Sequence, residues 1–155
     1  ICGGWYGTLA AMILDSDIDV DFIRSFDKDP ACAEIADTLN RSWVIDGWKF
    51  KALTEDILNM NFEAPVLRPE TEGVPANTII NTSCEHIENF TKWFSAIPKD
   101  KLVALQTNNY FELSEHVNCV KDINQFKQQA PLSNIIYEGE LELEKYTRYM
   151  LIGYV

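Results

Sequence analysis

The residues best suited to chemistry lie where apolar runs of the sequence end, and the first of them are glycines. The segment ICGGWYG, residues 1–7, places Trp5 and Tyr6 among glycines. Glycine lets a backbone pass close to a ligand or to another part of the chain. Aromatic rings in such a loop favour a positively charged ligand, although they could equally pack between a helix and a sheet. The loop contains only part of the GxGxxG pattern that holds a dinucleotide phosphate.

Acidic residues end the next two apolar runs. Asp27 ends the segment VDFIRSFD, and Asp56 ends the segment KFKALTED. Asp27 follows the glycines at about the separation at which nucleotide-binding folds place an acid on the ribose, and a carboxylate can accept both hydroxyls of a diol. In the competing interpretation, Asp27 and Asp29 only cap the next helix, and Asp56 is a solvated turn residue. Glu55 is equally acidic and is the rival of Asp56.

The two histidines, His86 and His116, follow later apolar runs and are candidates for proton transfer. Imidazole titrates near neutral pH, so either residue could act as a general base or orient a polar acceptor. The segment TSCE before His86 matches a capping box, in which Thr82 and Glu85 would only close a helix end. The segment NNYFELSEHVNC has side chains that suit a pocket wall, and it could equally be an ordinary loop. The candidates there are Asn108, Asn109, Tyr110 and Glu112.

The composition predicts one domain over residues 1–155, because 155 residues with 46% apolar content can bury a sizeable core. The chain has 24 Asp and Glu against 13 Lys and Arg, and the formal charge of −11 disfavours nucleic acid and anionic membranes as partners. No apolar run approaches the roughly 20 residues of a membrane span. The four cysteines are widely spread and include no CxxC pair, which predicts reduced thiols in a cytoplasmic protein without a metal site.

Apolar, β-branched runs alternate with stretches of helical period, which is the pattern of βαβ units and a largely parallel sheet. Strands are predicted at residues 1–2, 20–27, 49–56, 77–83 and 101–108. The chain opens inside the first of these strands, so we expect part of that strand to precede Ile1. Residues 61–77 form an acidic, proline-containing stretch that predicts a long surface loop, and this loop could serve as a lid or a binding segment.

Helices are predicted between the strands. The first covers residues 8–14, and the second begins with Asp29 as N-cap and Pro30 in the first turn. Ala31, Ile35 and Leu39 fall on one face of this second helix. A third helix has an apolar face formed by Ile87, Phe90, Phe94 and Ile97.

The last segment, SNIIYEGELELEKYTRYMLIGYV, contains two strand-like runs joined by polar residues around Glu142 to Lys145, which predicts an antiparallel hairpin. Ligands of open α/β sheets bind outside the carboxyl ends of the strands. The glycines, the acids and the histidines all follow predicted strands, so we expect them to share that edge.

In this order, the segments resemble the class I S-adenosylmethionine-dependent methyltransferases. ICGGWYG is similar to their glycine-rich first motif, FDKDPACAEIA to the acidic second motif, LTEDI to the third and TIINTS to the fourth. The hairpin resembles the antiparallel sixth and seventh strands of that fold. The resemblance covers nearly the whole chain and implies a three-layer αβα Rossmann-like sheet that is mostly parallel.

The resemblance implies S-adenosylmethionine as the cofactor and methyl transfer as the reaction. It places the glycines beside the methionine part, Asp27 on the ribose, and Asp56 with the backbone of Ile57 on the adenine. The implied cofactor-binding residues are Gly3, Gly4, Trp5, Tyr6, Gly7, Asp27, Lys28, Asp56, Ile57, Asn81 and Ser83. The implied catalytic residues are His86 and His116, and Asn108 and Tyr110 are expected to line the substrate site.

A small molecule or a protein group is the expected acceptor. Cytosine-C5 methyltransferases carry a proline before their nucleophilic cysteine, whereas Ser83 precedes Cys84 here, so a buried and inert thiol is favoured. NTSC stands where enzymes that methylate amino groups of nucleic acids carry (N/D)PP(Y/F). Two alternatives stay open. One is an NAD(P)-dependent oxidoreductase, which the hairpin and the incomplete fingerprint disfavour, and the other is a non-catalytic methyltransferase-like binding protein, which the irregular glycine loop suggests.

Overall fold

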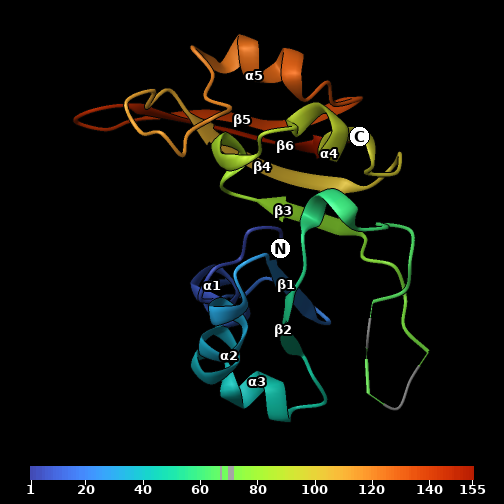
Figure 1. The fold of residues 1–155 in the computed structure, drawn as a ribbon. Coiled ribbons are helices and arrows are strands. Elements are labelled where there is room, and N and C mark those ends of the chain that lie inside the picture. The colour runs from blue at the N-terminus through green and yellow to red at the C-terminus, as the bar shows by residue number, and fades with distance from the viewer. Residues whose placement is uncertain (67, 70–71) are drawn as a thin grey trace. The chain divides into compact units, whose positions relative to one another are not determined.

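The computed structural model describes residues 1–66, 68–69 and 72–155, and these residues group into two compact units. We call residues 1–76 unit 1 and residues 77–155 unit 2 (Figure 1). Each unit contains α-helices and part of the β-structure. The single domain over residues 1–155 stays a prediction.

The sheet of unit 1 is parallel, as the sequence predicts. Strand β1 (Ile23–Asp27) pairs with β2 (Phe50–Thr54). Cys2 forms an isolated parallel bridge with Phe26, so the start of the chain also runs along β1. Because carboxyl ends of parallel segments meet at one edge, the glycine loop and the residues that follow β1 and β2 lie at the same edge of this sheet.

Three helices accompany this sheet, namely α1 (Thr8–Leu14), α2 (Pro30–Leu39) and α3 (Arg41–Ile45). The α2 helix begins as predicted, because the Asp29 carboxylate accepts a hydrogen bond from the Ala31 N–H at 2.9 Å. The core between the helices and the sheet consists of Ala10, Ile23, Ala36, Phe50 and Ala52.

The apolar face predicted for α2 is not the face that is buried. Ile35 and Leu39 are 44% and 53% exposed, whereas Cys32 and Ala36 are buried. Small side chains let the helix backbone lie close to the sheet, so they occupy the inner face in place of the larger apolar residues.

The stretch 61–77 contains no helix or strand among its described residues, which agrees with the predicted loop. Residues 67, 70 and 71 of this stretch lie outside the part of the chain that the structure describes.

The sheet of unit 2 has four strands in the order β3-β4-β6-β5. The strands β3 (Thr78–Asn81) and β4 (Leu102–Asn108) are parallel. The predicted hairpin is formed by β5 (Asn134–Glu142) and β6 (Thr147–Tyr154), and β6 is antiparallel to both β5 and β4. The mostly parallel sheet that ends in an antiparallel hairpin is therefore confirmed within the two units.

The helices of unit 2 are α4 (Phe90–Ser95) and α5 (Ile123–Gln129). The α5 helix packs on β5 and β6 (Figure 1) and was not expected from the sequence. The face predicted from periodicity is buried as expected, and it consists of Ile87, Phe90, Phe94 and Ile97. Phe90 contacts both Trp93 and Phe126, with ring centroids 5.5 and 6.4 Å apart, so aromatic packing joins α4 to α5.

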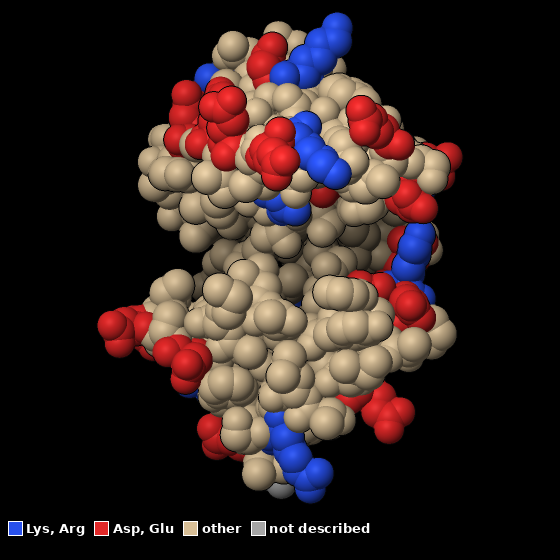
Figure 2. Space-filling model, turned by 90° about the vertical axis from the view of Figure 1, so that its left-hand side faces the viewer, with Lys and Arg blue, Asp and Glu red and all other residues tan. Residues whose placement is uncertain are grey.

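None of the helices in the described parts of the chain is both long and apolar enough to span a bilayer. Figure 2 shows one face of the molecule, on which acidic side chains are scattered with Lys and Arg between them. This distribution agrees with the composition, in which 24 acidic residues outnumber 13 basic residues.

Candidate functional site

The glycine loop of unit 1 is fastened to the carboxyl end of β1. The Gly4 N–H donates to the Phe26 carbonyl at 2.9 Å, and the Trp5 N–H donates to Asp27 Oδ2 at 3.0 Å. A Cβ on Gly4 would lie 1.8 Å from Ser25 Oγ and 3.2 Å from Ser25 Cβ, so the buried Ser25 side chain would have to move to admit any other residue at this approach to β1. Gly3 differs, because a Cβ there would meet no atom within 4 Å. The backbone at Gly3, with φ of +65°, therefore borders open space.

Gly7 begins α1 and has a structural reason to be glycine. Its φ is +75°, and a Cβ would lie 2.7 Å from Asn40 Nδ2. The buried Asn40 amide donates to the Gly7 carbonyl at 3.2 Å. The predicted cofactor contact of Gly7 stays a prediction beside this packing role.

The Trp5 and Tyr6 rings stack on each other, with centroids 4.3 Å apart and planes inclined by 19°. Trp5 is 62% exposed, so the interpretation that its ring packs between a helix and the sheet is wrong. Its φ of +47° is unusual for a residue other than glycine. Such backbone outliers cluster at functional sites, and the exposed Trp5 ring of this pair is available to a ligand, while Tyr6 is half-buried.

Asp27 and Asp29 have separate tasks. Asp29 alone caps α2, while Asp27 Oδ1 accepts from the Asp29 N–H at 3.0 Å and Asp27 Oδ2 accepts from Trp5. Each carboxylate oxygen has two acceptor positions, so both oxygens of the partly exposed Asp27 can accept a further hydrogen bond. Lys28 between the two acids is exposed.

Asp56 caps the short 3₁₀ helix η1 (Ile57–Asn59), because its carboxylate accepts from the Leu58 N–H at 3.0 Å. Asp56 is exposed and Ile57 is half-buried. The rival residue, Glu55, donates its backbone N–H to the Asp27 carbonyl at 2.9 Å. Glu55 and Asp56 thus lie at the same edge of the unit 1 sheet as Asp27.

In unit 2, the end of β3 is shaped by Asn81. This residue is buried, and its Oδ1 accepts from the Ser83 N–H at 2.8 Å. Cys84 is fully buried with its Sγ 3.5 Å from the Asn81 carbonyl oxygen, which agrees with an inert thiol. Ser83 precedes the 3₁₀ helix η2 (Cys84–His86) without a side-chain cap.

The structure brings His86 and His116 together, with ring centroids 4.7 Å apart and planes at 87°. His86 Nδ1 lies 3.0 Å from the Glu115 carbonyl oxygen, and His116 Nδ1 lies 2.8 Å from the Tyr110 carbonyl oxygen. A carbonyl can only accept, so each Nδ1 carries a proton, and the neutral form of each ring has its lone pair on Nε2. The two sequence-predicted catalytic residues therefore form a pair.

Glu85 is a site residue that the sequence interpretation missed. The predicted capping box is wrong, because η2 begins at Cys84 and Ser83 makes no side-chain cap. Glu85 is instead buried, at 3% exposed, and its Oε1 accepts from Asn108 Nδ2 at 2.8 Å. The available signal was an acid directly before a histidine at the end of a predicted strand.

Asn108 and Tyr110 follow β4. Asn108 is buried, and its Oδ1 accepts from the Tyr110 N–H at 2.9 Å and from Cys119 Sγ at 3.3 Å, so its amide holds protein groups in place. The Tyr110 ring stacks on Tyr146 at 5.2 Å and meets His116 edge-on at 5.9 Å. Contact of either residue with a substrate stays a prediction.

The two remaining candidates for the pocket wall, Asn109 and Glu112, differ in their contacts. Asn109 Oδ1 accepts from the Thr147 N–H at 2.7 Å, and its Nδ2 donates to Tyr149 Oη at 3.1 Å. Glu112 is exposed. Asn109 is therefore used to fasten the loop after β4 to β6.

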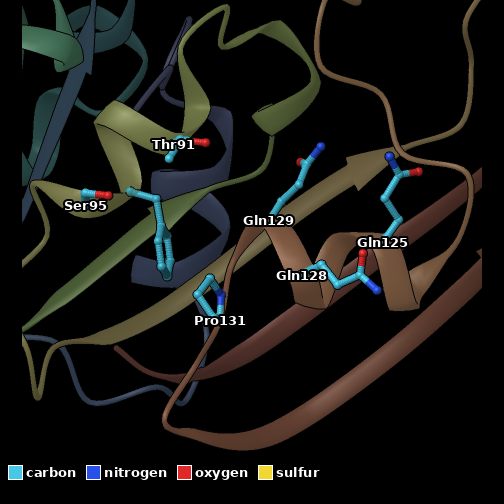
Figure 3. A pocket seen from close by; sticks show the side chains of 7 residues that line it. Thr91, Ser95, Gln125, Gln128, Gln129 and Pro131 are labelled. Carbon is cyan, nitrogen blue, oxygen red and sulfur yellow. The ribbon is translucent and has the colours of Figure 1, made fainter.

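A hollow of about 370 Å³ lies elsewhere in unit 2, between α4 and α5 (Figure 3). It contains none of the residues predicted from the sequence to bind cofactor or substrate. Its lining residues are Thr91, Phe94, Ser95, Gln125, Gln128, Gln129 and Pro131.

No protein-family model matches the chain, and no curated protein matches its sequence. Solved structures do match. Magnesium protoporphyrin IX methyltransferase from Synechocystis PCC 6803, with bound S-adenosylmethionine (SAM), is 11% identical, with a TM-score of 0.63 over 99% of this chain and 67% of that chain. The N-methyltransferase NodS from Bradyrhizobium japonicum WM9 is 8% identical, with a TM-score of 0.67 over 99% and 82%.

An O-methyltransferase family protein from Burkholderia thailandensis is 15% identical, with a TM-score of 0.61 over 98% of this chain and 49% of that chain. At such identities the likeness concerns the fold. Together with the parallel strands and the closing hairpin, it confirms the fold class predicted from the motifs. The chain has the Rossmann-like fold of the class I SAM-dependent methyltransferases.

Proposed function

We propose that the protein is a SAM-dependent methyltransferase that acts on a small molecule or a protein group. The observation that carries this proposal is the glycine loop of unit 1, which is fastened to the Asp27 carboxylate by the Trp5 N–H while the backbone at Gly3 borders open space. The methyltransferase fold supports the proposal, and so does the binding of SAM by the Synechocystis structure.

The residues of this loop fit SAM. The cofactor carries a positive sulfonium and no phosphate, so it needs no anion-binding loop. The exposed Trp5 ring, stacked on the half-buried Tyr6, suits a cation, because the face of an aromatic ring is electronegative. Asp27 retains acceptor positions for the two ribose hydroxyls, and Asp56 lies at the same sheet edge to accept from an adenine amino group.

Bound SAM supplies an activated methyl group, and the chain has to orient the acceptor and take its proton. We assign these tasks to His86 and His116, since both rings present Nε2 as an acceptor. Tyr110 borders His116 and is placed to contact the acceptor. Asn108 is assigned a positioning role through Glu85.

The net charge of −11 supports a small-molecule or protein acceptor over a nucleic acid. The four cysteines are widely spread along the sequence and include no CxxC pair, and this supports a reducing compartment, for which we propose the cytoplasm.

Isothermal titration calorimetry with SAM tests the cofactor assignment. We expect one site per chain and a loss of affinity of about 10- to 100-fold in Asp27→Ala, because two charge-assisted hydrogen bonds to the ribose disappear. Asp21→Ala is the matched control, since Asp21 is an exposed acid of the same segment, and it should bind like the wild type.

A folded wild-type chain that binds no SAM would overturn the proposal. Titration of NADH fluorescence is the companion measurement, and saturable NADH binding in place of SAM binding would favour the oxidoreductase alternative. SAM binding without turnover across broad acceptor pools would favour the non-catalytic alternative.

A further inference from the structure

We infer that Glu85, His86 and His116 form a binding site for one divalent transition-metal ion. One ligand atom of each residue lies within 4.8 Å of the other two. Glu85 and His86 belong to η2 after β3, and His116 belongs to the loop after β4. Because β3 and β4 are parallel neighbours, their carboxyl ends deliver all three side chains to one edge of the unit 2 sheet.

The two imidazoles are already held in the form that binds a metal. A ligating histidine usually donates its second ring N–H to a carbonyl or carboxylate, which fixes the tautomer and the ring orientation. His86 does this through Nδ1 to the Glu115 carbonyl, and His116 through Nδ1 to the Tyr110 carbonyl. Both backbone acceptors belong to the loop after β4, so one loop orients both rings.

Glu85 supplies a buried carboxylate, one oxygen of which is left without a hydrogen bond by the described residues. Its Oε1 accepts from Asn108, whereas its Oε2 is buried and has no hydrogen-bond partner among the described residues. An unsatisfied buried carboxylate oxygen is costly. His86 Nε2 lies 4.0 Å from Glu85 Oε1, which is too far for a hydrogen bond, and a cation bound to the carboxylate would remove this cost.

The segments that carry the ligands are tied to each other. The Asn118 N–H donates to the Glu85 carbonyl at 2.8 Å, and Asn118 Nδ2 donates to the Cys84 carbonyl at 3.2 Å. Asn118 thus fixes the His116 loop against η2, while Asn108 fixes the Glu85 carboxylate. These two asparagines act as positioning residues, in the way that outer groups support metal ligands in known sites.

The donor set indicates the class of ion. Two imidazoles and one carboxylate are the ligands of open zinc sites and of non-haem iron(II) sites, and they leave further coordination positions free. Ligands at about 2.1 Å from one ion lie about 3.4 Å apart in tetrahedral geometry, whereas the three ligand atoms lie within 4.8 Å of one another, so each pair would have to approach by at most about 1.4 Å. His86 is half-exposed, which gives an ion access from solvent.

The metal site stands on this geometry alone, while its use in catalysis rests on the proposed function. The free coordination positions suit an oxygen or nitrogen atom of the acceptor. With an ion bound, His86 and His116 would orient the acceptor as metal ligands, and the proton-accepting task assigned to them above would apply only to the rings without an ion. The acceptor would accordingly be a small molecule or side chain with a metal-binding heteroatom.

Titration of the untagged chain, residues 1–155, with Co²⁺, followed by visible absorption, tests the site. The d–d bands of Co²⁺ report nitrogen and oxygen ligation, and we expect them to saturate at one ion per chain. Glu85→Gln and His116→Ala should each weaken Co²⁺ binding at least about 10-fold. Glu88→Gln is the matched control, because Glu88 is exposed and belongs to the same segment.

The inference is overturned if Co²⁺ does not bind, or if Glu85→Gln and His116→Ala bind as the wild type does while circular dichroism shows them folded. His116→Gln serves if the alanine variant does not fold. Calorimetry with SAM on the same samples separates the two proposals. Metal binding without SAM binding contradicts only the proposed function, and SAM binding without metal binding contradicts only the metal site.

Discussion

Asp27 shows how one side chain can organise a site before any ligand binds. Its two carboxylate oxygens accept backbone N–H groups from Trp5 and from Asp29, so the acid joins the glycine loop to the start of α2. The loop also holds Trp5 at a φ of +47°, a conformation with a steric cost for a residue with a Cβ. The Asp27 hydrogen bond to the Trp5 N–H offsets part of that cost.

Gly4 gives a prediction at the same scale. In Gly4→Ala the new Cβ would lie 1.8 Å from Ser25 Oγ, so we expect the free energy of unfolding to fall by about 1–3 kcal/mol. Urea denaturation measures this loss. Adding Ser25→Ala removes the hydroxyl and should recover part of it. An unchanged midpoint in the single variant would contradict the close approach of the loop to β1.

At the scale of helices and strands, some elements could be predicted from local sequence patterns and others could not. The prolyl start of α2 and the two strand-like runs joined by polar residues predicted α2 and the hairpin correctly, because capping and strand-forming runs depend on neighbouring residues. The inner face of α2 was not predictable in this way. A periodic pattern identifies which residues share a face, and packing distance decides which face is buried, so Ala36 is buried while Leu39 is exposed.

Tyr149 provides a test of how β6 holds the loop after β4. Its Oη accepts from Asn109 Nδ2 at 3.1 Å and donates to the Lys121 carbonyl at 2.9 Å. We expect Tyr149→Phe to lower the free energy of unfolding by about 1–2 kcal/mol at neutral pH, because two partly buried hydrogen bonds are lost. Chemical denaturation at pH 7 measures this change.

The same residue predicts a pH dependence. Burial raises the pKa of the Tyr149 phenol, so the folded chain keeps this proton to higher pH than the unfolded chain does. The resulting stability is complete below the unfolded pKa of about 10 and is lost as the pH rises through the folded pKa. Wild type should therefore lose stability in alkaline solution more steeply than Tyr149→Phe. Equal slopes would contradict this prediction.

At the scale of the whole molecule, each unit has its own sheet and buried residues. We expect residues 77–155 to fold when expressed alone, since β3, β4, β6 and the aromatic cluster of α4 and α5 lie within them. Trp93 is the only tryptophan of this fragment and is buried. Its fluorescence should be blue-shifted and should move to longer wavelength in a cooperative urea transition. Emission typical of exposed tryptophan without urea would contradict the prediction.

The sequence alone determined the alternation of strands and helices, the parallel pairs, the closing hairpin and the resemblance to methyltransferases. These features depend on periodicity, capping and motif order, which neighbouring residues encode. The sequence also identified His86 and His116 as candidate catalytic residues, but it did not show that they lie together. Only the tertiary structure decided that the two rings meet and that Glu85 is buried beside them, because the pairing of β3 with β4 brings together segments that are distant along the chain.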